Sequence, residues 1–236
     1  MAPAEPGAIA FPFEGPAVVI GASGGIGAAL VTALRAAGLP VAAFARSFAG
    51  AARLDLSDEA SIAAAAASLP APPTLVIVAT GLLDQPEKNM AQLDPARLAR
   101  AFAVNAIGPA LVAKHFLPRC PRDRPTVFAA LSARVGSIGD NRLGGWHGYR
   151  ASKAALNQLI RTLGIEQARR NPRAVVAALH PGTVDTGLSR PFQANVPADR
   201  LFTPDQSAAH LLAVIARLTP ADSGRLFAWD GAEITP

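Results

Sequence analysis

Short apolar runs alternate along the chain with longer segments in which apolar residues recur every three or four positions. The runs are five to seven residues long, and Gly, Pro or polar residues bound them. Continuous apolar runs of this length are typical of strands that are buried on both faces of a parallel sheet. The runs that we predict to be strands are 17–21, 41–45, 52–56, 74–79, 125–131, 174–180 and 224–230.

The longer segments predict helices between most of these strands. Ser57 precedes one such segment as its expected N-cap, and Gly108-Pro109 is expected to kink another. The predicted helices span 25–37, 58–69, 94–117, 148–170 and 203–218.

Strands that alternate with helices at this spacing predict an α/β protein with a parallel sheet and helices on both faces. We therefore expect one doubly wound, Rossmann-type domain with a sheet of about seven strands. No linker, repeat or low-complexity segment divides the chain. The domain is expected to span residues 16–236, after an N-terminal arm of residues 1–15.

Composition and charge narrow the range of partners. The net charge of +5 comes from scattered arginines rather than from a dense basic run, which argues against nucleic-acid binding. Cys120 is the only cysteine, so neither an intramolecular disulfide nor a cysteine metal site is expected. The N-terminus lacks a basic start, and no apolar run approaches the ~20 residues that a membrane span needs. We expect a cytoplasmic protein that binds no metal and no membrane.

The first predicted strand meets the first predicted helix at the glycine-rich sequence GASGGIG, residues 21–27. Parallel sheets bind ligands beyond the carboxyl ends of their strands, and free amides at a helix N-terminus bind phosphate. Gly21 permits a tight turn, while Gly25 and Gly27 let the backbone approach a pyrophosphate. The spacing G-x-x-x-G-x-G differs from the G-x-G-x-x-G of many dinucleotide-binding proteins. Its position at a strand–helix junction nevertheless predicts a dinucleotide site.

The same stretch also satisfies G-x-S-x-G, the pattern around the nucleophile of α/β hydrolases. In that alternative Ser23 would be the nucleophile, with His180 or His210 as the base and Asp185 or Asp205 as its partner. The nucleophile of such enzymes normally lies deep in the sheet, whereas only one strand precedes Ser23. The dinucleotide site is therefore favoured.

Tyr149 is the only tyrosine, and Lys153 is one of three lysines, four residues later in a predicted helix. Residues at i and i+4 share a helix face, with Cβ atoms roughly 5–6 Å apart. A nearby ammonium stabilises a phenolate and lowers the phenol pKa from about 10. The pair therefore predicts an acid/base unit that exchanges a proton with a carbonyl or an alcohol.

These features together resemble the short-chain dehydrogenase/reductase family, and in particular its C-factor and sniffer carbonyl-reductase branch. The resemblance covers residues 16–231 and includes Ser132 at the end of a predicted strand. The motifs that carry it are GASGGIG (21–27), NAIG (105–108), YRASK (149–153) and PGTVDT (181–186).

The resemblance implies a role for each catalytic position. Tyr149 would be the general acid/base, and Ser132 would hydrogen-bond the reacting oxygen, with Ser137 as the alternative serine. Lys153 would bind the nicotinamide ribose and lower the tyrosine pKa, and Asn105 would hold a water in a proton relay. The implied substrate is a small-molecule carbonyl or alcohol.

The resemblance also implies a set of cofactor contacts along the carboxyl edge of the sheet. The sequence departs from the family at VATG (78–81), where NNAG is usual, and in a longer loop between Ser132 and Tyr149. The implied contacts are Gly21, Ser23, Gly25, Ile26, Gly27, Arg46, Asp55, Leu56, Thr80, Gly81, Tyr149, Lys153, Pro181, Gly182, Val184 and Thr186.

The end of the second strand predicts the cofactor. An acidic residue there favours the ribose 2′-hydroxyl of NAD, whereas an arginine favours the 2′-phosphate of NADP. Here Ala45 replaces the acid, and Arg46 and Ser47 follow. Gly24 stands where many NADP-preferring relatives carry a second basic residue. We predict NADP(H), with NAD(H) as the alternative.

Two further expectations concern function and assembly. The alternative to an enzyme is a non-catalytic nucleotide-binding signalling protein on the same fold, against which the acid/base tyrosine argues. His147 is expected to be an uninvolved histidine, although it lies near enough to Tyr149 to touch substrate. Trp146, Leu188 and Phe192 are candidates for an apolar pocket.

Helices 94–117 and 149–170 contain more apolar residues than the one face that packs on the sheet needs. Some of these residues are expected to face a second copy of the chain, which predicts a homodimer or homotetramer.

Overall fold

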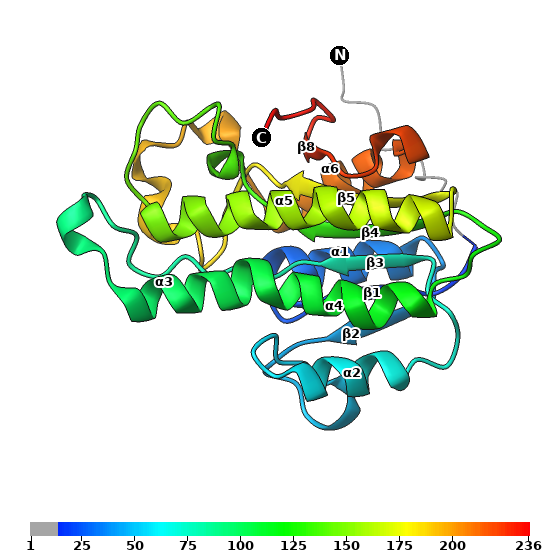
Figure 1. Cartoon of the computed structure of the whole chain (residues 1–236). Coiled ribbons are helices and arrows are strands. Elements are labelled where there is room, and N and C mark those ends of the chain that lie inside the picture. The colour runs from blue at the N-terminus through cyan, green and yellow to red at the C-terminus, as the bar shows by residue number, and fades with distance from the viewer. Residues whose placement is uncertain (1–13) are drawn as a thin grey trace, which may run out of the picture.

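A computed structural model describes residues 14–236, so the predicted arm of residues 1–15 lies almost wholly outside the described residues. Its central feature is a parallel sheet of six strands in the order β2-β1-β3-β4-β5-β8 (Figure 1). The strands are β1 (Ala17–Ile20), β2 (Val41–Phe44), β3 (Leu75–Val78), β4 (Thr126–Leu131), β5 (Ala174–His180) and β8 (Leu226–Ala228). The α-helices are α1 (Gly25–Ala36), α2 (Glu59–Ala67), α3 (Pro95–Phe102), α4 (Gly108–Phe116), α5 (His147–Arg170) and α6 (Pro204–Arg217).

Helices cover both faces of the sheet, as predicted for a doubly wound fold. Figure 1 shows α4 and α5 in front of the sheet and α1 behind it. Alternate residues of each strand belong to two separate core clusters: Val18 and Ile20 pack with α2, α4 and α5, whereas Ala17 and Val19 pack with α1 and α6. Strand β1 pairs with both β2 and β3, so the chain reverses its direction of winding beside β1. Ligands of open parallel sheets bind at such a point.

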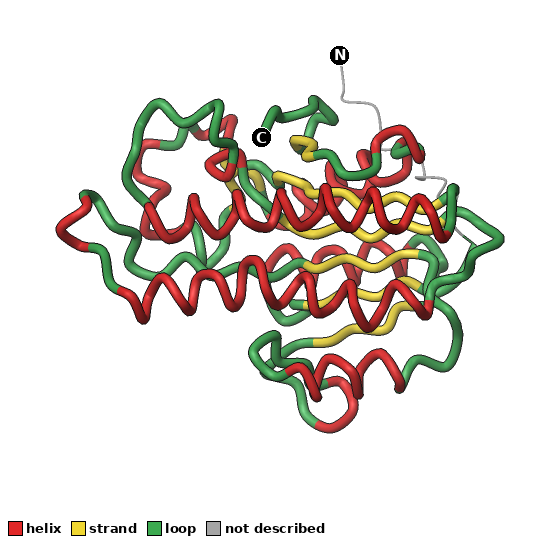
Figure 2. Tube along the Cα trace, in the orientation of Figure 1, coloured by secondary structure: helices red, strands yellow, loops and turns green. Residues whose placement is uncertain are grey.

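The predicted strand 52–56 is wrong, which reduces seven expected strands in the sheet to six. A 3₁₀ turn (Gly50–Ala52) and a single bridge between Ala45 and Arg53 occupy this region (Figure 2). A parallel crossover needs a dozen or more residues, and too few separate this segment from β2. Leu54 and Leu56 are apolar because they pack into the core, not because they belong to a strand. A separate two-stranded sheet pairs β6 (Thr183–Val184) with β7 (Leu201–Phe202).

The long predicted helix 94–117 contains a π-helical segment, Ala103–Ile107, between α3 and α4. Pro109 has no N–H to donate to the carbonyl of Asn105, so regular α-helical bonding cannot continue through this point. Gly108 lies against Leu56, whose Cβ would be 2.7 Å from a Cβ at position 108. The predicted kink thus takes the form of a wider turn that carries Asn105.

The N-cap of α2 also differs from the prediction. Asp58, not Ser57, precedes the helix, and its carboxylate accepts hydrogen bonds from the amides of Ala60 and Ser61. Ser57 instead donates to Asp55 from both its amide and its hydroxyl. None of the helices described in residues 14–236 combines the length and hydropathy needed to span a membrane.

Candidate active site

The predicted site residues follow the carboxyl ends of the strands. The glycine turn follows β1, Thr80 and Gly81 follow β3, Ser132 follows β4, and Pro181 follows β5. Because these strands are parallel and paired in register, their carboxyl ends lie at one edge of the sheet. The fold therefore gathers segments from four distant parts of the chain.

The backbone of the glycine turn approaches its neighbours closely. Gly21 has φ +91°, and a Cβ there would lie 2.8 Å from the carbonyl oxygen of Ala79. A Cβ on Gly27 would overlap the carbonyl oxygen of Gly21. Gly24, the N-cap of α1, offers no side-chain cap, and the first turn of α1 contains no acidic residue. The free amides of this helix end fit a pyrophosphate.

Glycines also form the walls beyond this turn. A Cβ on Gly25 would lie 2.9 Å from Cγ2 of Thr186. A Cβ on Gly81 would lie 3.5 Å from Cδ1 of Leu188 and 3.9 Å from Nζ of Lys153. Bare backbone therefore faces the 186–188 segment and the lysine, an arrangement that fits an elongated nucleotide.

The segment after β5 is fixed by its neighbours. The carbonyl of Pro181 accepts a hydrogen bond from the Ser207 hydroxyl at 3.0 Å. Gly182 has φ +78°, and a Cβ there would lie 2.6 Å from the ring of Phe202. Val184 is buried in β6. These contacts fix the course of the backbone after β5.

Two of the residues expected at the adenosine end, Asp55 and Leu56, already have partners within the protein. Hydrogen bonds from Ser57 hold the pKa of the Asp55 carboxyl below its usual value, with smaller contributions from the charges of Arg46 and Arg53. Leu56 is buried in the core. Arg46 is exposed next to the buried Ala45. Arg46 therefore offers the free charge at this end of the site.

Tyr149 and Lys153 lie on one face of α5, as predicted. The Nζ atom of Lys153 is 5.8 Å from the centroid of the Tyr149 ring and donates a 2.8 Å hydrogen bond to the carbonyl of Leu131. Burial lowers the pKa of the lysine to about 7 and raises the pKa of the tyrosine to about 12. We expected a lowered tyrosine pKa. The amine instead faces Leu131 and carries only part of its charge near neutral pH, and it is burial that keeps the phenol protonated there.

Ser132 follows β4 as predicted, but its hydroxyl makes a hydrogen bond within the protein that its expected role does not include. Its hydroxyl is buried and donates a 2.7 Å hydrogen bond to Oδ1 of Asn157. The Asn157 amide group donates to the carbonyl of Gly136 at 3.3 Å, which fixes the orientation of the amide. A serine has one proton, and here Asn157 takes it. In this arrangement Ser132 has no proton to offer a reacting oxygen.

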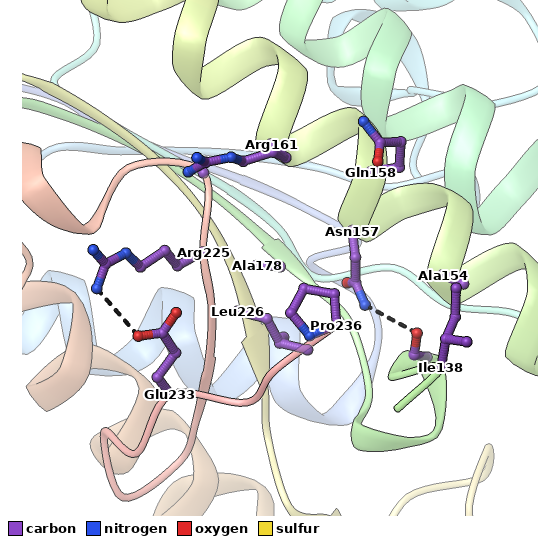
Figure 3. A pocket seen from close by; sticks show the side chains of 12 residues that line it. Ile138, Ala154, Asn157, Gln158, Arg161, Ala178, Arg225, Leu226, Glu233 and Pro236 are labelled. Atoms are coloured by element: carbon purple, nitrogen blue, oxygen red, sulfur yellow. Dashed lines mark hydrogen bonds and ion pairs between the residues drawn. The ribbon is translucent and has the colours of Figure 1, made fainter. Parts of the chain in front are cut away.

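Ser137, the alternative serine, is also buried and committed. Its hydroxyl donates to the carbonyl of Thr235 and accepts from the amide of Asp140. Figure 3 shows the adjoining pocket, of about 510 Å³, which lies between α5 and the C-terminal segment, with Asn157 on one wall. The two serines thus bond to Asn157 of α5 and to Thr235 of the C-terminal segment.

Asn105 connects the loop after β3 to α5. Its side chain exchanges two hydrogen bonds with the backbone of Leu82, at 2.7 and 2.8 Å, and donates to the hydroxyl of Ser152 at 3.0 Å. The residue is fully buried, and both its amide nitrogen and its amide oxygen have hydrogen-bond partners. A water held by Asn105 would bind the main-chain carbonyl, to which Pro109 has no N–H to donate.

Aromatic side chains continue outward from Tyr149. The centroid of the Trp146 ring lies 6.3 Å from that of Tyr149 and 4.9 Å from that of Phe192. Trp146 and Phe192 line a pocket of about 700 Å³ together with the 83–88 loop. Nδ1 of His147 is buried without a hydrogen-bond partner among the described residues. Leu188, the third residue predicted for an apolar pocket, does not line it.

The hydrolase alternative finds no support in the geometry. Ser23 is exposed, and no hydrogen bond in residues 14–236 joins it to a histidine. Burial lowers the pKa of His180 to about 4, far from its ordinary range. Within the described residues, no three His, Cys, Asp or Glu side chains are grouped closely enough to hold a metal ion.

The structure adds residues that the sequence analysis missed. Asn157 is four residues after Lys153 on the same helix, a spacing from which its proximity to the site could have been predicted. The carbonyl of Leu131 and the carboxylate of Glu87, which contacts the start of α5, have no such signal. Both contacts join segments that are far apart in the sequence.

Comparisons with known proteins identify relatives of this chain. C-signal of Myxococcus xanthus is 37% identical over 145 residues, which cover 61% of this chain and 82% of that protein. The 1-hydroxy-2-glutathionyl-2-methyl-3-butene dehydrogenase of Rhodococcus sp. is 34% identical over 144 residues. That match covers 61% of this chain but only 60% of the relative.

Solved structures extend the likeness to almost the whole chain. The NADPH-bound carbonyl reductase from chicken fatty liver is 27% identical, with a TM-score of 0.81, and the match covers 94% of this chain and 98% of that one. A carbonyl reductase from Pseudomonas aeruginosa is 25% identical, with a TM-score of 0.79, covering 94% and 100%. A sequence model described as short chain dehydrogenase matches residues 16–197. The chain belongs to the short chain dehydrogenase family of oxidoreductases.

Proposed function

We propose that this protein is an NADP(H)-dependent oxidoreductase that reduces a small-molecule carbonyl or oxidises the matching alcohol. The observation that carries the proposal is Tyr149 beside the buried Lys153 on one face of α5, next to the bare backbone of Gly81. Family membership supports the reaction type, and the glycine turn supports the dinucleotide.

When bound, the nicotinamide would supply or accept the hydride. Tyr149 would exchange the proton: a phenol with a pKa of about 12 is protonated near neutral pH and can donate to a carbonyl oxygen. Lys153 would stabilise the phenolate that results and bind the nicotinamide ribose. Its hydrogen bond to Leu131 holds the amine at the edge of the sheet. Asn105 would fix the 82 loop and α5 relative to each other.

The cofactor preference is proposed from the end of β2. Ala45 offers no carboxylate to repel a 2′-phosphate, and the exposed Arg46 is free to bind one. The similar chicken carbonyl reductase is NADPH-bound, which supports this choice. A charge-assisted contact of about 1.5–3 kcal/mol corresponds to roughly 10–150-fold in affinity.

A second candidate function is favoured by one observation. The protons of Ser132 and Ser137 are both used inside the protein, so the expected hydrogen bond to a reacting oxygen has no donor in this arrangement. A nucleotide-binding signalling protein would not need that donor. The likeness to C-signal, a relative named for a signal, is compatible with this alternative.

One experiment separates the two functions. Aldehydes, ketones and quinones are supplied with NADPH or NADH, and the absorbance of the reduced nicotinamide is followed. Steady turnover, with a kcat/KM at least tenfold higher for NADPH, is the expected result. The double variant Ala45→Asp with Arg46→Ala should shift the preference toward NADH. Tight NADPH binding without turnover of any carbonyl would favour the signalling function instead.

We also propose a homodimer or homotetramer. Phe116 and Leu156 are buried in the core, so they are not available to a partner. Ile107 and Ile165 are large apolar residues that are exposed in the segments 94–117 and 149–170. We propose that they contact a second copy of the chain.

A further inference from the structure

The helix that carries Tyr149 begins without a cap of its own. Trp146, the N-cap residue of α5, makes no side-chain cap, and the first turn of α5 contains no acidic residue. The first amides of a helix have no partner within the helix and need one elsewhere. Here a residue 61 positions earlier supplies it: the carboxylate of Glu87 accepts a hydrogen bond from the amide of Gly148 at 3.1 Å.

Glu87 contacts the same turn a second time through its backbone. Its carbonyl oxygen accepts a hydrogen bond from the amide of Trp146 at 2.5 Å. The Glu87 side chain is buried, with the residue only 5% exposed. None of the ion pairs among the described residues includes Glu87. A buried carboxylate needs compensation, and the N-terminus of α5 provides it.

The two segments that Glu87 joins are both strained. Gln85 (φ +41°) and Trp146 (φ +53°) are the only non-glycine residues with positive φ in the described chain, and one lies in each segment. Such conformations persist where surrounding contacts hold them, and they are concentrated at functional sites. Glycines make the contact close: a Cβ on Gly148 would lie 3.1 Å from Oε1 of Glu87, and a Cβ on Gly145 would lie 3.4 Å from its carbonyl oxygen.

Tyr149 follows Gly148 directly, and the ring of Trp146 packs against the ring of Tyr149. Glu87, Gly148 and Tyr149 line one small pocket together. Arg97 also lines this pocket, but its guanidinium donates to the backbone of Gln92 and lies near Asp94, not Glu87. The position of the first turn of α5 therefore depends on Glu87.

We propose that Glu87 is a positioning residue for the reaction: its carboxylate anchors the first turn of α5 and so sets the place of the Tyr149 phenol and of the Trp146 wall. The inference rests on the proposed function for its kinetic consequence, but not for the contact itself. A shift of the phenol by about 1 Å is enough to reduce turnover about 10²-fold.

Two variants and one matched control test the proposal. Glu87→Ala removes the acceptor, whereas Glu87→Gln keeps an oxygen of similar placement and removes the charge. Asp58→Ala is the control, because it removes a carboxylate cap from α2, away from Tyr149. The measurements are kcat with NADPH and a carbonyl that the parent reduces, the Kd of NADPH from its fluorescence, and hydrogen exchange at the amides of Gly148 and Trp146.

We expect Glu87→Ala to lower kcat about tenfold or more, with the Kd of NADPH changed less than twofold and faster exchange at Gly148. Glu87→Gln should recover most of the protection and part of kcat, and Asp58→Ala should leave both at the parent's values. A Glu87→Ala variant with kcat within threefold of the parent would overturn the proposal. So would an equal loss of kcat and NADPH affinity, which would indicate general disruption.

Two further cases keep the test decisive. If Glu87→Ala does not fold, the proposal is overturned when Glu87→Gln has the parent's kcat although its Gly148 amide exchanges without protection. If the parent turns over no carbonyl, the proposed function fails, and parental exchange at Gly148 in the variants would still refute the anchor.

Discussion

Around the glycine turn the site is formed by bare backbone, whereas around Tyr149 it is formed by buried polar side chains that hydrogen-bond to distant segments of the chain. In the first region, a Cβ on Gly21, Gly25 or Gly27 would meet neighbouring atoms at 2.9 Å or less. In the second, Asn105 and Lys153 each use their polar atoms on backbone groups from other segments. The nucleotide region thus depends on residues being small, and the catalytic region depends on residues finding partners.

The largest expected effect tests the catalytic region at its centre. Tyr149→Phe removes one hydroxyl, which has no hydrogen-bond partner among the described residues, and leaves the ring packed against Trp146. We expect turnover to fall roughly 10²–10⁴-fold, the scale of general acid–base catalysis. The Kd of NADPH, measured by fluorescence, should change little. Turnover within a factor of three of the parent would remove Tyr149 from the mechanism.

The contrast between the two regions also explains what the sequence could predict. Requirements on size and local spacing are visible in one segment of chain, so the glycine turn and the Tyr149–Lys153 pair were predicted in their places. Partners drawn from distant segments are not visible, and so Leu131 and Glu87 were missed. The place of Ser132 after a strand was predicted, but its hydrogen bond to Asn157 was not, because that partner lies in a distant segment.

Apolar patterning was sufficient for the approximate positions of all six helices, with α3 and α4 predicted as one, and for every strand of the sheet. It was insufficient at 52–56. There the same pattern comes from packing of Leu54 and Leu56 next to β2, and only chain length between the segments distinguishes the two cases. Pro109 was expected to kink its helix, but the sequence does not specify that a π-helical turn accommodates it.

A matched pair of substitutions breaks the nucleotide region selectively. In Gly27→Ala the new methyl group overlaps the carbonyl of Gly21, so the turn must open. In Gly24→Ala the methyl group would lie 3.4 Å from the same carbonyl, an ordinary contact. We expect Gly27→Ala to weaken NADPH binding at least about tenfold and to cost about 1–3 kcal/mol of stability. Gly24→Ala should bind nearly as the parent does, and equal binding by both variants would contradict the backbone-built site.

A smaller effect is expected at Ser132, where the two regions meet. If the hydroxyl stays on Asn157, Ser132→Ala leaves a buried amide oxygen without its donor, which costs about 1–3 kcal/mol of stability. Turnover should then fall less than about tenfold, since the reacting oxygen loses no direct partner. Thermal unfolding and kcat are measured on the same preparations. A fall of 10²-fold or more in kcat at parental stability would show that the serine turns toward the substrate.

The buried lysine is expected to change the slope of stability against pH. Burial lowers the pKa of Lys153 from near 10.5 to about 7, so between these values the unfolded chain binds a proton that the folded chain does not. The free energy of unfolding of the parent therefore rises with pH across this window. Below pH 7 the full cost of burying the charge is present, and above pH 10.5 it disappears. Lys153→Met removes the titration and leaves the Leu131 carbonyl without a donor, a loss that does not depend on pH.

Denaturant unfolding of the parent and of Lys153→Met at several pH values between 7 and 10 measures the difference. The advantage of the methionine variant should be largest at pH 7 and should shrink steadily as pH rises. Cys120 and Tyr149 also titrate with raised pKa values, near 12, but both are present in both proteins, so their effects cancel in the difference. A difference that stays constant across this range would mean that Lys153 keeps an ordinary pKa. The amine would then be fully charged at neutral pH, as the acid/base pairing inferred from the sequence requires, and the catalytic region would be more polar than its buried contacts indicate.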